Sequence, residues 1–503
     1  MVNKYITENL STIKEINVPH ILSISNQQHL EYYSIQTALM RYLHIKIEIL
    51  NEQNKIVGEV SGIAIDGSFN INADSIIRRT CDLTFSLTDG YLPENNNSIF
   101  WINKKFILYV GLSNIQQDTI YWFNKGTYII KDPNINITVT DNVIKISGLD
   151  KMALYSGDID GQLTTATMVT YESGATRRNT VKAIMMDGGE NEDNIIIEDS
   201  TVMNEIIPYN IESSIGDCTT NVLDKIIDTI ANYQYYYDLN GKFNFTSKPI
   251  KGDFRNNNIE WDFEQKNNVV ISIDRNIDYA NVKNRITVWG GVHDDGYQPS
   301  YTLVLSDKDS EFGDSPFTIE KLNEKHPDGS TMYRDYVEQC DDFIDAVLDF
   351  DNTTTEVNYP YNICVKYRAS NDDPYTYYHC KNVNGTTNLK GLPDTNITDW
   401  QEICTATQLE DASDDTLENY MQKIHAYSIA LCEAKTKELM FAYYLANDTI
   451  TITCVPIYSL DVNSVIIMND KLSGAKGLYV VKDISCQLNA SGTMTITAHK
   501  LWD

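Results

Sequence analysis

The chain contains the same strand pattern twice, once in its first half and once at its C-terminal end. Residues 126–132 read GTYIIKD and residues 477–483 read GLYVVKD. Each copy runs through a polar turn into a second alternating stretch, VIKISG at 143–148 and TMTITA at 493–498. Because side chains alternate between the two faces of a strand, this pattern predicts two β-hairpins, each with one buried face. A duplicated β unit is typical of an assembly component rather than of a catalytic fold.

A weaker echo precedes each copy. Residues 65–66 (ID) lead through a polar loop to a strand pattern at 79–85, and residues 273–274 (ID) lead to another at 285–288. These echoes extend the predicted duplication from a hairpin to a larger β domain. The alternative is that two unrelated strand pairs share a common β pattern, which short segments match by chance.

Composition favours a mainly β chain with some α-helix (α+β) and several domains. Apolar residues make up 42% of the 503 residues, and Tyr is frequent at 32, against 14 Phe. Tyr favours strands and half-wet surfaces. The formal charge of −30 disfavours tight binding to nucleic-acid phosphates, which needs a basic surface. It is compatible with a passage that repels DNA and lets it through.

The sequence predicts a protein made in a reducing cytoplasm. The N-terminus lacks a charged region followed by an apolar stretch, so no secretory signal is visible. No apolar run approaches the roughly 18 residues that span a bilayer. Nine cysteines occur without a C-x-x-C pair, which fits reduced thiols better than a disulfide framework.

Periodicity divides the chain into five parts. They are an N-terminal extension at 1–43, a first β domain at 44–156, a connecting α+β domain at 157–268, a second, discontinuous β domain at 269–290 and 416–503, and an inserted domain at 291–415. The strand spacing of the first β domain suits a barrel or a sandwich. Amphipathic stripes predict a helix at 217–231 in the connecting domain and a long helix at 416–445.

Common catalytic signatures are absent from the sequence, so we expect no enzyme and no cofactor. Phosphate loops, H-E-x-x-H, G-x-S-x-G and C-x-x-C do not occur. A carboxylate pair leaves no local signature, so a hydrolase stays an alternative. Cys364, His379, Cys380 and Cys404 share one segment, but their spacing fits no familiar closed zinc site, and we expect no metal.

An aromatic-rich segment at 361–404 is the candidate binding region. It resembles small chitin- and cellulose-type carbohydrate-binding modules, with Tyr377 and Tyr378 before a Pro- and Asn-containing loop and Trp400 after it. In such a module the aromatic faces would stack on a sugar of the host surface. The alternative, which we favour, is that Tyr378 and Trp400 form the core of a small β domain, because a domain of this size must bury its aromatics to fold.

The repeated hairpins also resemble a known family. Residues 126–132 leading to 146–152, the helix near Val222, residues 281–290 (NVKNRITVWG) and residues 477–498 are similar to the tail hub proteins of tailed bacteriophages, a family that includes the hub part of contractile injection systems. The resemblance covers about 44–156, 207–290 and 416–503. It implies two tube-type β-barrel domains per chain.

The resemblance also implies a function. Three copies would present six barrels and adapt the sixfold tail tube to the threefold tip, so the expected partners are the chain itself, the tail tube protein, other tail-tip or baseplate proteins, and DNA in transit. The expected location is the distal tail of the virion. The insert at 291–415 departs from the family pattern, and the chain stops where many relatives continue into a peptidase or fibre, so lytic activity is not expected. The alternatives are a carbohydrate-binding host-recognition protein and a cell-wall hydrolase.

Overall fold

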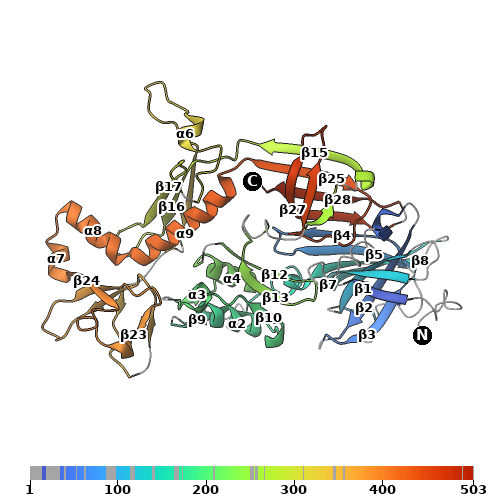
Figure 1. The fold of residues 1–503 in the computed structure, drawn as a ribbon. Helices are drawn as coiled ribbons and strands as arrows, with labels where there is room; N and C mark the ends of the chain where they lie inside the picture. The colour runs from blue at the N-terminus through green and yellow to red at the C-terminus, as the bar shows by residue number, and fades with distance from the viewer. Residues whose placement is uncertain are drawn as a thin grey trace.

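The computed structural model describes residues 14–18, 34–38, 41–51, 54–61, 64–86, 94, 98–102, 104–113, 119–138, 142–163, 169–172, 174–207, 210–230, 232–249, 254, 259–264, 267–309, 311–341, 343, 347–354, 357–489 and 491–501. Most of the predicted N-terminal extension at 1–43 therefore lies outside the described residues. The fold is mainly β with smaller helical parts, which confirms the predicted class (Figure 1). In the described part of the chain, no helix is both long and apolar enough to cross a membrane.

One continuous sheet of 14 strands dominates the structure. Its first half contains β1 (Lys14–Val18), β2 (Tyr42–Leu50), β3 (Ile56–Ser61), β4 (Ala64–Asn72), β5 (Arg79–Ser86), β6 (Lys105–Ser113), β7 (Thr119–Ile137) and β8 (Asn142–Asp150). Its second half contains β14 (Ile259–Asp262), β15 (Val270–Asp278), β25 (Asn447–Cys454), β26 (Val465–Asn469), β27 (Lys476–Gln487) and β28 (Met494–Lys500). Figure 1 shows the blue first half beside the red second half. Strand β4 pairs with β27 and so joins them.

The two halves repeat one unit of five strands. The first half has the order β4-β5-β8-β7-β6, and the second has β15-β25-β28-β27-β26. The registers also agree, because Ile129 lies opposite Leu149 and Val480 lies opposite His499. Each long strand then has a bulge, at Lys131 on β7 and at Lys482 on β27. The predicted hairpin duplication is thus visible strand by strand.

The first two strands of each unit correspond in the same way. Strand β4 pairs with β5 through a register shift between Ala64 and Asp66, and β15 pairs with β25 through a shift between Val270 and Ser272. The predicted correspondence between residues 285–288 and the strand at 79–85 is therefore wrong. The counterpart of β5 is β25, whereas residues 285–288 lie in β16 (Arg285–Gly290), which pairs with β17 (Ser300–Val304) and β18 (Asp335–Cys340) in a separate sheet.

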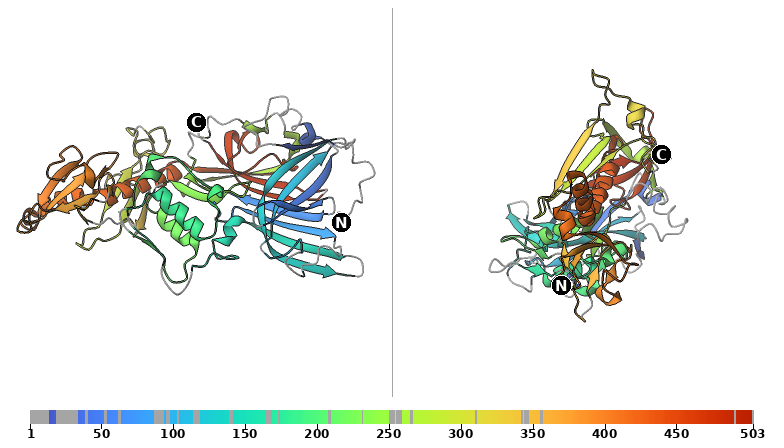
Figure 2. Two further views of the ribbon diagram at one scale, coloured as in Figure 1. Left: turned by 90° about the horizontal axis from the view of Figure 1, so that it is seen from below. Right: turned by 90° about the vertical axis from the view of Figure 1, so that its left-hand side faces the viewer.

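The inserted unit interrupts the hairpin between β15 and β25, whose facing ends are Asp278 and Asn447. Besides β16–β18 it holds α6 (Ile319–Leu322), β19 (Leu348–Asp349), β20 (Asn358–Tyr359), β21 (Cys364–Tyr367), β22 (Thr376–Cys380), β23 (Thr386–Thr387), η7 (Asn388–Lys390), β24 (Trp400–Thr405), α7 (Ala406–Glu410), α8 (Asp414–Ile424) and α9 (Ala426–Tyr443). It extends away from the large sheet (Figure 2).

This insertion is larger than the predicted 291–415. Helix α9 packs on β16 and β17 through Cys432 and Met440, which share a buried cluster with Ile286 and Val288. The predicted long helix at 416–445 is two helices, because the chain breaks at His425. Strand β16 and helices α8 and α9 thus belong to the inserted unit rather than to the second β domain.

The connecting part lies between the sheet and the inserted unit (Figure 1). It contains η4 (Lys151–Leu154), β9 (Thr170–Tyr171), α2 (Arg177–Asp187), η5 (Glu192–Asn194), β10 (Ile195–Ile197), α3 (Thr201–Asn204), β11 (Ile211–Glu212), α4 (Thr219–Ile227), β12 (Tyr233–Tyr237) and β13 (Phe243–Ser247); η6 (Asn267–Val269) precedes β15. Helix α4 lies within the predicted 217–231 and buries Val222, Leu223 and Ile226. Residues 259–262, which the predicted boundary 157–268 placed in this part, form β14 and belong to the large sheet.

Candidate assembly site between the two halves of the sheet

The internal junction is the edge-to-edge pairing of β4 with the last part of β27. Ala73 donates its backbone N–H to the Lys482 carbonyl at 2.9 Å, and Leu488 donates to the Gly67 carbonyl at 2.7 Å. Between these ends, Ile484 lies opposite Ile71 and Cys486 lies opposite Phe69. All four of these side chains are fully buried in one hydrophobic cluster that spans both halves. The halves therefore share a core as well as a sheet.

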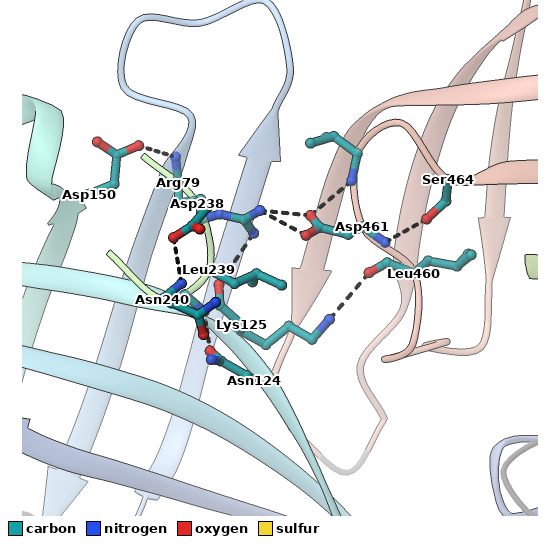
Figure 3. Close-up of polar contacts among 12 residues, drawn as sticks. Arg79, Asn124, Lys125, Asp150, Asp238, Leu239, Asn240, Leu460, Asp461 and Ser464 are labelled. Atoms are coloured by element: carbon teal, nitrogen blue, oxygen red, sulfur yellow. Dashed lines mark hydrogen bonds and ion pairs between the residues drawn. The ribbon is translucent and has the colours of Figure 1, made fainter. Parts of the chain in front are cut away.

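A buried ion pair also crosses the junction (Figure 3). Arg79 begins β5 in the first half, and Asp461 lies in the loop between β25 and β26 in the second half. The Arg79 Nη2 donates to both Asp461 carboxylate oxygens, at 3.0 and 2.8 Å. Burial alone would raise the pKa of Asp461, but the adjacent Arg79 guanidinium lowers it below its usual value. The largest contribution that keeps this carboxylate charged thus comes from a residue of the other half.

Lys125 on β7 forms a second contact across the junction. Its Nζ donates to the Leu460 carbonyl at 3.2 Å, and its own carbonyl accepts a hydrogen bond from the Tyr128 hydroxyl at 2.8 Å. The Lys125 side chain is buried over the Phe69 ring. Burial lowers its pKa to about 8, although Asp461 partly opposes this shift. Burial of this ammonium group removes its hydration shell, which costs free energy that the other contacts of the fold offset.

Two buried carboxyl groups complete the network. Glu260 on β14 accepts a hydrogen bond from the Ser464 hydroxyl, and burial raises its pKa to about 7. Asp150 accepts backbone N–H bonds from Arg79 at 3.0 Å and from Met152 at 2.8 Å. Burial raises the pKa of Asp150 to about 6, while these hydrogen bonds oppose the shift. The junction therefore contains groups whose charge changes near neutral pH.

The connecting part also contacts β7 next to the junction. The Thr127 hydroxyl donates to the Leu239 carbonyl at 3.2 Å, in the turn between β12 and β13. Within the connecting part, the Lys151 ammonium fixes the same turn, because it donates to the Gly241 carbonyl at 3.1 Å and to Glu190 at 2.5 Å. Strand β7, which carries the repeated motif, is thus held by both the second half and the connecting part.

The arrangement can fix the relative orientation of the two halves. A buried ion pair adds little net stability, because desolvation offsets most of the attraction, but it strongly disfavours any arrangement that separates the partners. In the residues that the structure describes, no cluster of three His, Cys, Asp or Glu could hold a metal ion. Sequence reasoning missed these groups, since Arg79 and Asp461 are brought together only by the fold. The strand pattern at 79–85 was the one local signal.

The predicted glycan-contact residues lie in the inserted unit. Trp400 on β24 is 2% exposed, and its ring makes edge-to-face contacts with Phe350 and Tyr359 at centroid distances of 5.9 and 5.4 Å. Tyr378 is buried in the same cluster, whereas Tyr377 is half-buried and packs in a different one, so the structure does not bring the three onto one face. Glycan contact by these residues stays a prediction.

The cysteines and the histidine of this segment are divided in the same way. Cys380 packs beside Trp400, and Cys364 and Cys404 pack in the second cluster. His379 lies opposite Cys364 on the neighbouring strand. All three thiols are buried, and burial raises their pKa where a shift is resolved, at Cys380 and Cys404, which disfavours the thiolate form that metals bind.

Neither a family model nor a curated protein matches the chain. Among solved structures, it is similar to the tail protein from Neisseria meningitidis MC58, at 9% identity and a TM-score of 0.47, over 91% of this chain and 96% of that one. It is also similar to the prophage MuSo2 43 kDa tail protein from Shewanella oneidensis, at 10% identity and a TM-score of 0.44, over 91% and 98%. A chain of a Francisella PdpA–VgrG complex matches at 10% identity and a TM-score of 0.45, over 92% of this chain and 53% of that one.

Proposed function

We propose that this chain is a structural hub of a phage tail, and that three copies form a ring at the distal end of the tail tube. The observation that carries the proposal is the repeated five-strand unit, joined edge to edge within one chain by β4 and β27. Two equivalent units per chain give six units in a trimer. Such a ring has threefold symmetry as an assembly and nearly sixfold symmetry in its β units, as an adaptor between a tube and a tip requires.

The proposed role involves no chemistry of its own. The ionisable groups at the internal junction are buried: Arg79 pairs with Asp461, Lys125 bonds the Leu460 carbonyl, and Glu260 bonds the Ser464 hydroxyl. This suits a fixed interface between units better than a reaction centre. The net charge of −30 would repel DNA in a central passage rather than retain it. The proposed partners are the tail tube protein on one side and other tail-tip or baseplate proteins on the other, and the proposed location is the virion.

Native mass measurement tests the oligomer directly. The purified chain should have three times the monomer mass at micromolar concentration, and a monomer or a ring of six copies would contradict the proposal. The location is tested separately with tails that carry an epitope tag in the exposed turn at Lys471–Leu472. Antibody label should appear at the distal end, and label along the tube or at the head-proximal end would argue against a hub.

A further inference from the structure

The sheet has a second pair of edges that corresponds to the pair joined at the internal junction. The register makes β15 the counterpart of β4, since both pair with the equivalent strands β25 and β5. The same register makes residues 131–137 of β7 the counterpart of residues 482–488. Residues 482–488 are the segment at the end of β27 that pairs with β4. One copy of the junction is therefore made inside the chain, and the parts of a second copy are present.

This second pair of edges has no strand on it. In the described residues, β15 pairs only with β25, and β7 beyond its bulge pairs only with β8. Exposure shows the same difference. Cys486 is 0% exposed and Leu488 is 1% exposed, whereas their counterparts Ile135 and Ile137 are 39% and 67% exposed. The apolar side chains that β4 helps to cover in one half are left open to solvent in the other.

We infer that β15 of one chain adds to residues 131–137 of β7 in a second copy of this chain, in the register of the internal junction. This inference rests on the proposed function for the number of copies and deepens it by naming the interface. The register places Ile277 opposite Pro133, Asn276 opposite Asn134, and Arg275 opposite Ile135. Each chain contributes one edge of each kind, so the contact is head-to-tail, and with the three copies of the proposed hub it closes into a ring.

The backbone supports this pairing. At the internal junction the backbone carbonyl of Lys482 and the backbone N–H of Leu488 point toward β4. The corresponding carbonyl of Lys131 and N–H of Ile137 therefore point away from β8, toward the open edge of β7. Residue 133 also faces outward, and there Pro has no N–H, so the pairing loses one donor but leaves the ladder with β8 intact. Proline at this position is typical of an edge strand. Unpaired edges are a liability that closure of the ring removes.

One feature of the register is unfavourable. The internal junction places Asp483 opposite Asn72, and the two side chains are hydrogen-bonded. The corresponding residues between chains are Asp132 and Asp278, and two carboxylates directly opposite each other repel. The contact between chains is therefore weaker than the contact within a chain, as suits a ring that assembles from separate subunits.

A disulfide between chains tests the register. Asn134 and Asn276 are exposed, and they form a non-hydrogen-bonded pair with Cα atoms about 4.5 Å apart, within the range that a disulfide spans. The full-length Asn134→Cys/Asn276→Cys protein should give covalent trimers under oxidising, non-reducing conditions. The control pair is Asn134→Cys/Ser272→Cys, four residues out of register along β15 and also exposed, and it should stay uncross-linked.

Two substitutions test the contact without added cysteines. Ile137→Glu should dissociate the ring into folded monomers, while Ile215→Glu, at an even more exposed isoleucine of the connecting part, should leave it intact. Asp278→Asn restores the Asp-to-Asn pairing of the internal junction and should lower the dissociation constant of the ring roughly fivefold.

The outcomes separate the inference from the proposed function. The inference is overturned, and the hub proposal stands, if the wild-type protein is a trimer but the Asn134→Cys/Asn276→Cys variant forms no disulfide between chains and Ile137→Glu leaves the trimer intact. The specific disulfide in an assembly of some other size supports the edge pairing and overturns the threefold hub. A monomeric wild-type protein, together with a double-cysteine variant that forms no disulfide between chains, overturns both the inference and the proposed function.

Discussion

Tyr128 on β7 and Tyr479 on β27 occupy the same position in the two halves of the sheet. Tyr128 lies opposite Asp150 and Tyr479 lies opposite Lys500, and both rings are completely buried. Each follows a glycine by two residues, Gly126 with φ +126° and Gly477 with φ +106°. The conserved spacing between the left-handed glycine and the buried ring explains why this motif was visible twice in the sequence.

The two glycines differ in what surrounds them, which gives a matched pair of variants. A Cβ at Gly126 would lie 2.7 Å from Arg79 Cδ, whereas a Cβ at Gly477 would meet no atom within 4 Å. Gly477→Ala should cost about 1–2 kcal/mol, because a positive φ strains an L-residue. Gly126→Ala should cost more, since it also displaces the arginine of the junction. Urea unfolding midpoints measure both, and equal losses would contradict this reading.

Arg79→Met should destabilise the chain by about 3–5 kcal/mol, because it leaves the buried Asp461 carboxylate without its partner. Lys182→Met, which breaks the exposed pair with Glu192, is the control and should cost at most about 1 kcal/mol. The double variant Arg79→Met/Asp461→Leu should recover much of the loss. Thermal unfolding compares the three, and no recovery in the double variant would show that the arginine acts through packing alone.

Glu260→Gln should change the dependence of stability on pH. Burial raises the pKa of Glu260 in the folded state to about 7, above its ordinary 4.5, so the fold holds the proton more tightly than the unfolded chain does. The stability that this group contributes is present below pH 4.5 and is lost as pH rises through 7. Glutamine does not ionise, so the variant should be more stable than wild type at pH 8, by about 1–3 kcal/mol, with little difference near pH 5.

Urea titrations at pH 5 and pH 8 measure that difference. Glu264→Gln provides the control, because Glu264 is an exposed carboxylate on the same segment, hydrogen-bonded to Asn469 at the surface. Its difference from wild type should be the same at both pH values. A Glu260→Gln protein with no gain at pH 8 would show that the carboxyl group is ionised in the fold without penalty.

The sequence predicted the repeated hairpins because they are local, with β7 followed directly by β8 and β27 by β28. It placed the counterpart of β5 wrongly at 285–288, because the inserted unit separates β15 from β25 in the chain, and β16 has a similar alternation. The break between α8 and α9 was also missed. His425 there bonds Asp295 at 2.7 Å and stacks on Tyr297, contacts that helical periodicity does not contain.

The candidate site was less predictable than the strands. Arg79, Lys125, Asp461 and Glu260 lie on four separate segments, and their importance depends on burial at a junction that only the fold creates. From sequence alone, a single charged residue in a strand pattern is predicted to lie on the solvent-exposed face. Nothing local distinguishes Asp461 from the many other carboxylates of an acidic chain.

The inserted unit should be removable when it is cut at the ends that the sheet defines. By register, residues 73–77 of the first half correspond to Tyr279–Ala446 of the second, because Arg78 is the counterpart of Asn447. Replacing Tyr279–Ala446 by ADSII should leave a folded protein with the native oligomeric state. Deleting Val292–Asp414, within the predicted boundaries, should instead cause aggregation, because it strips β17 and β18 from β16 and exposes α9. Size-exclusion chromatography separates the outcomes, and aggregation of both would place the whole unit in the core.

Trp400→Ala decides between the two interpretations of the aromatic segment. The ring is 2% exposed and packs against Phe350 and Tyr359, so its truncation should cost about 3–5 kcal/mol and unfold this part of the insert. Trp289→Ala removes a ring that is 39% exposed on β16 in the same unit, and it should be nearly neutral. Limited proteolysis and thermal unfolding report stability, and binding to purified host surface glycan is measured on the same samples. A Trp400→Ala protein that keeps its melting temperature but loses glycan binding would reverse the interpretation, since a buried core ring cannot be removed without loss of stability.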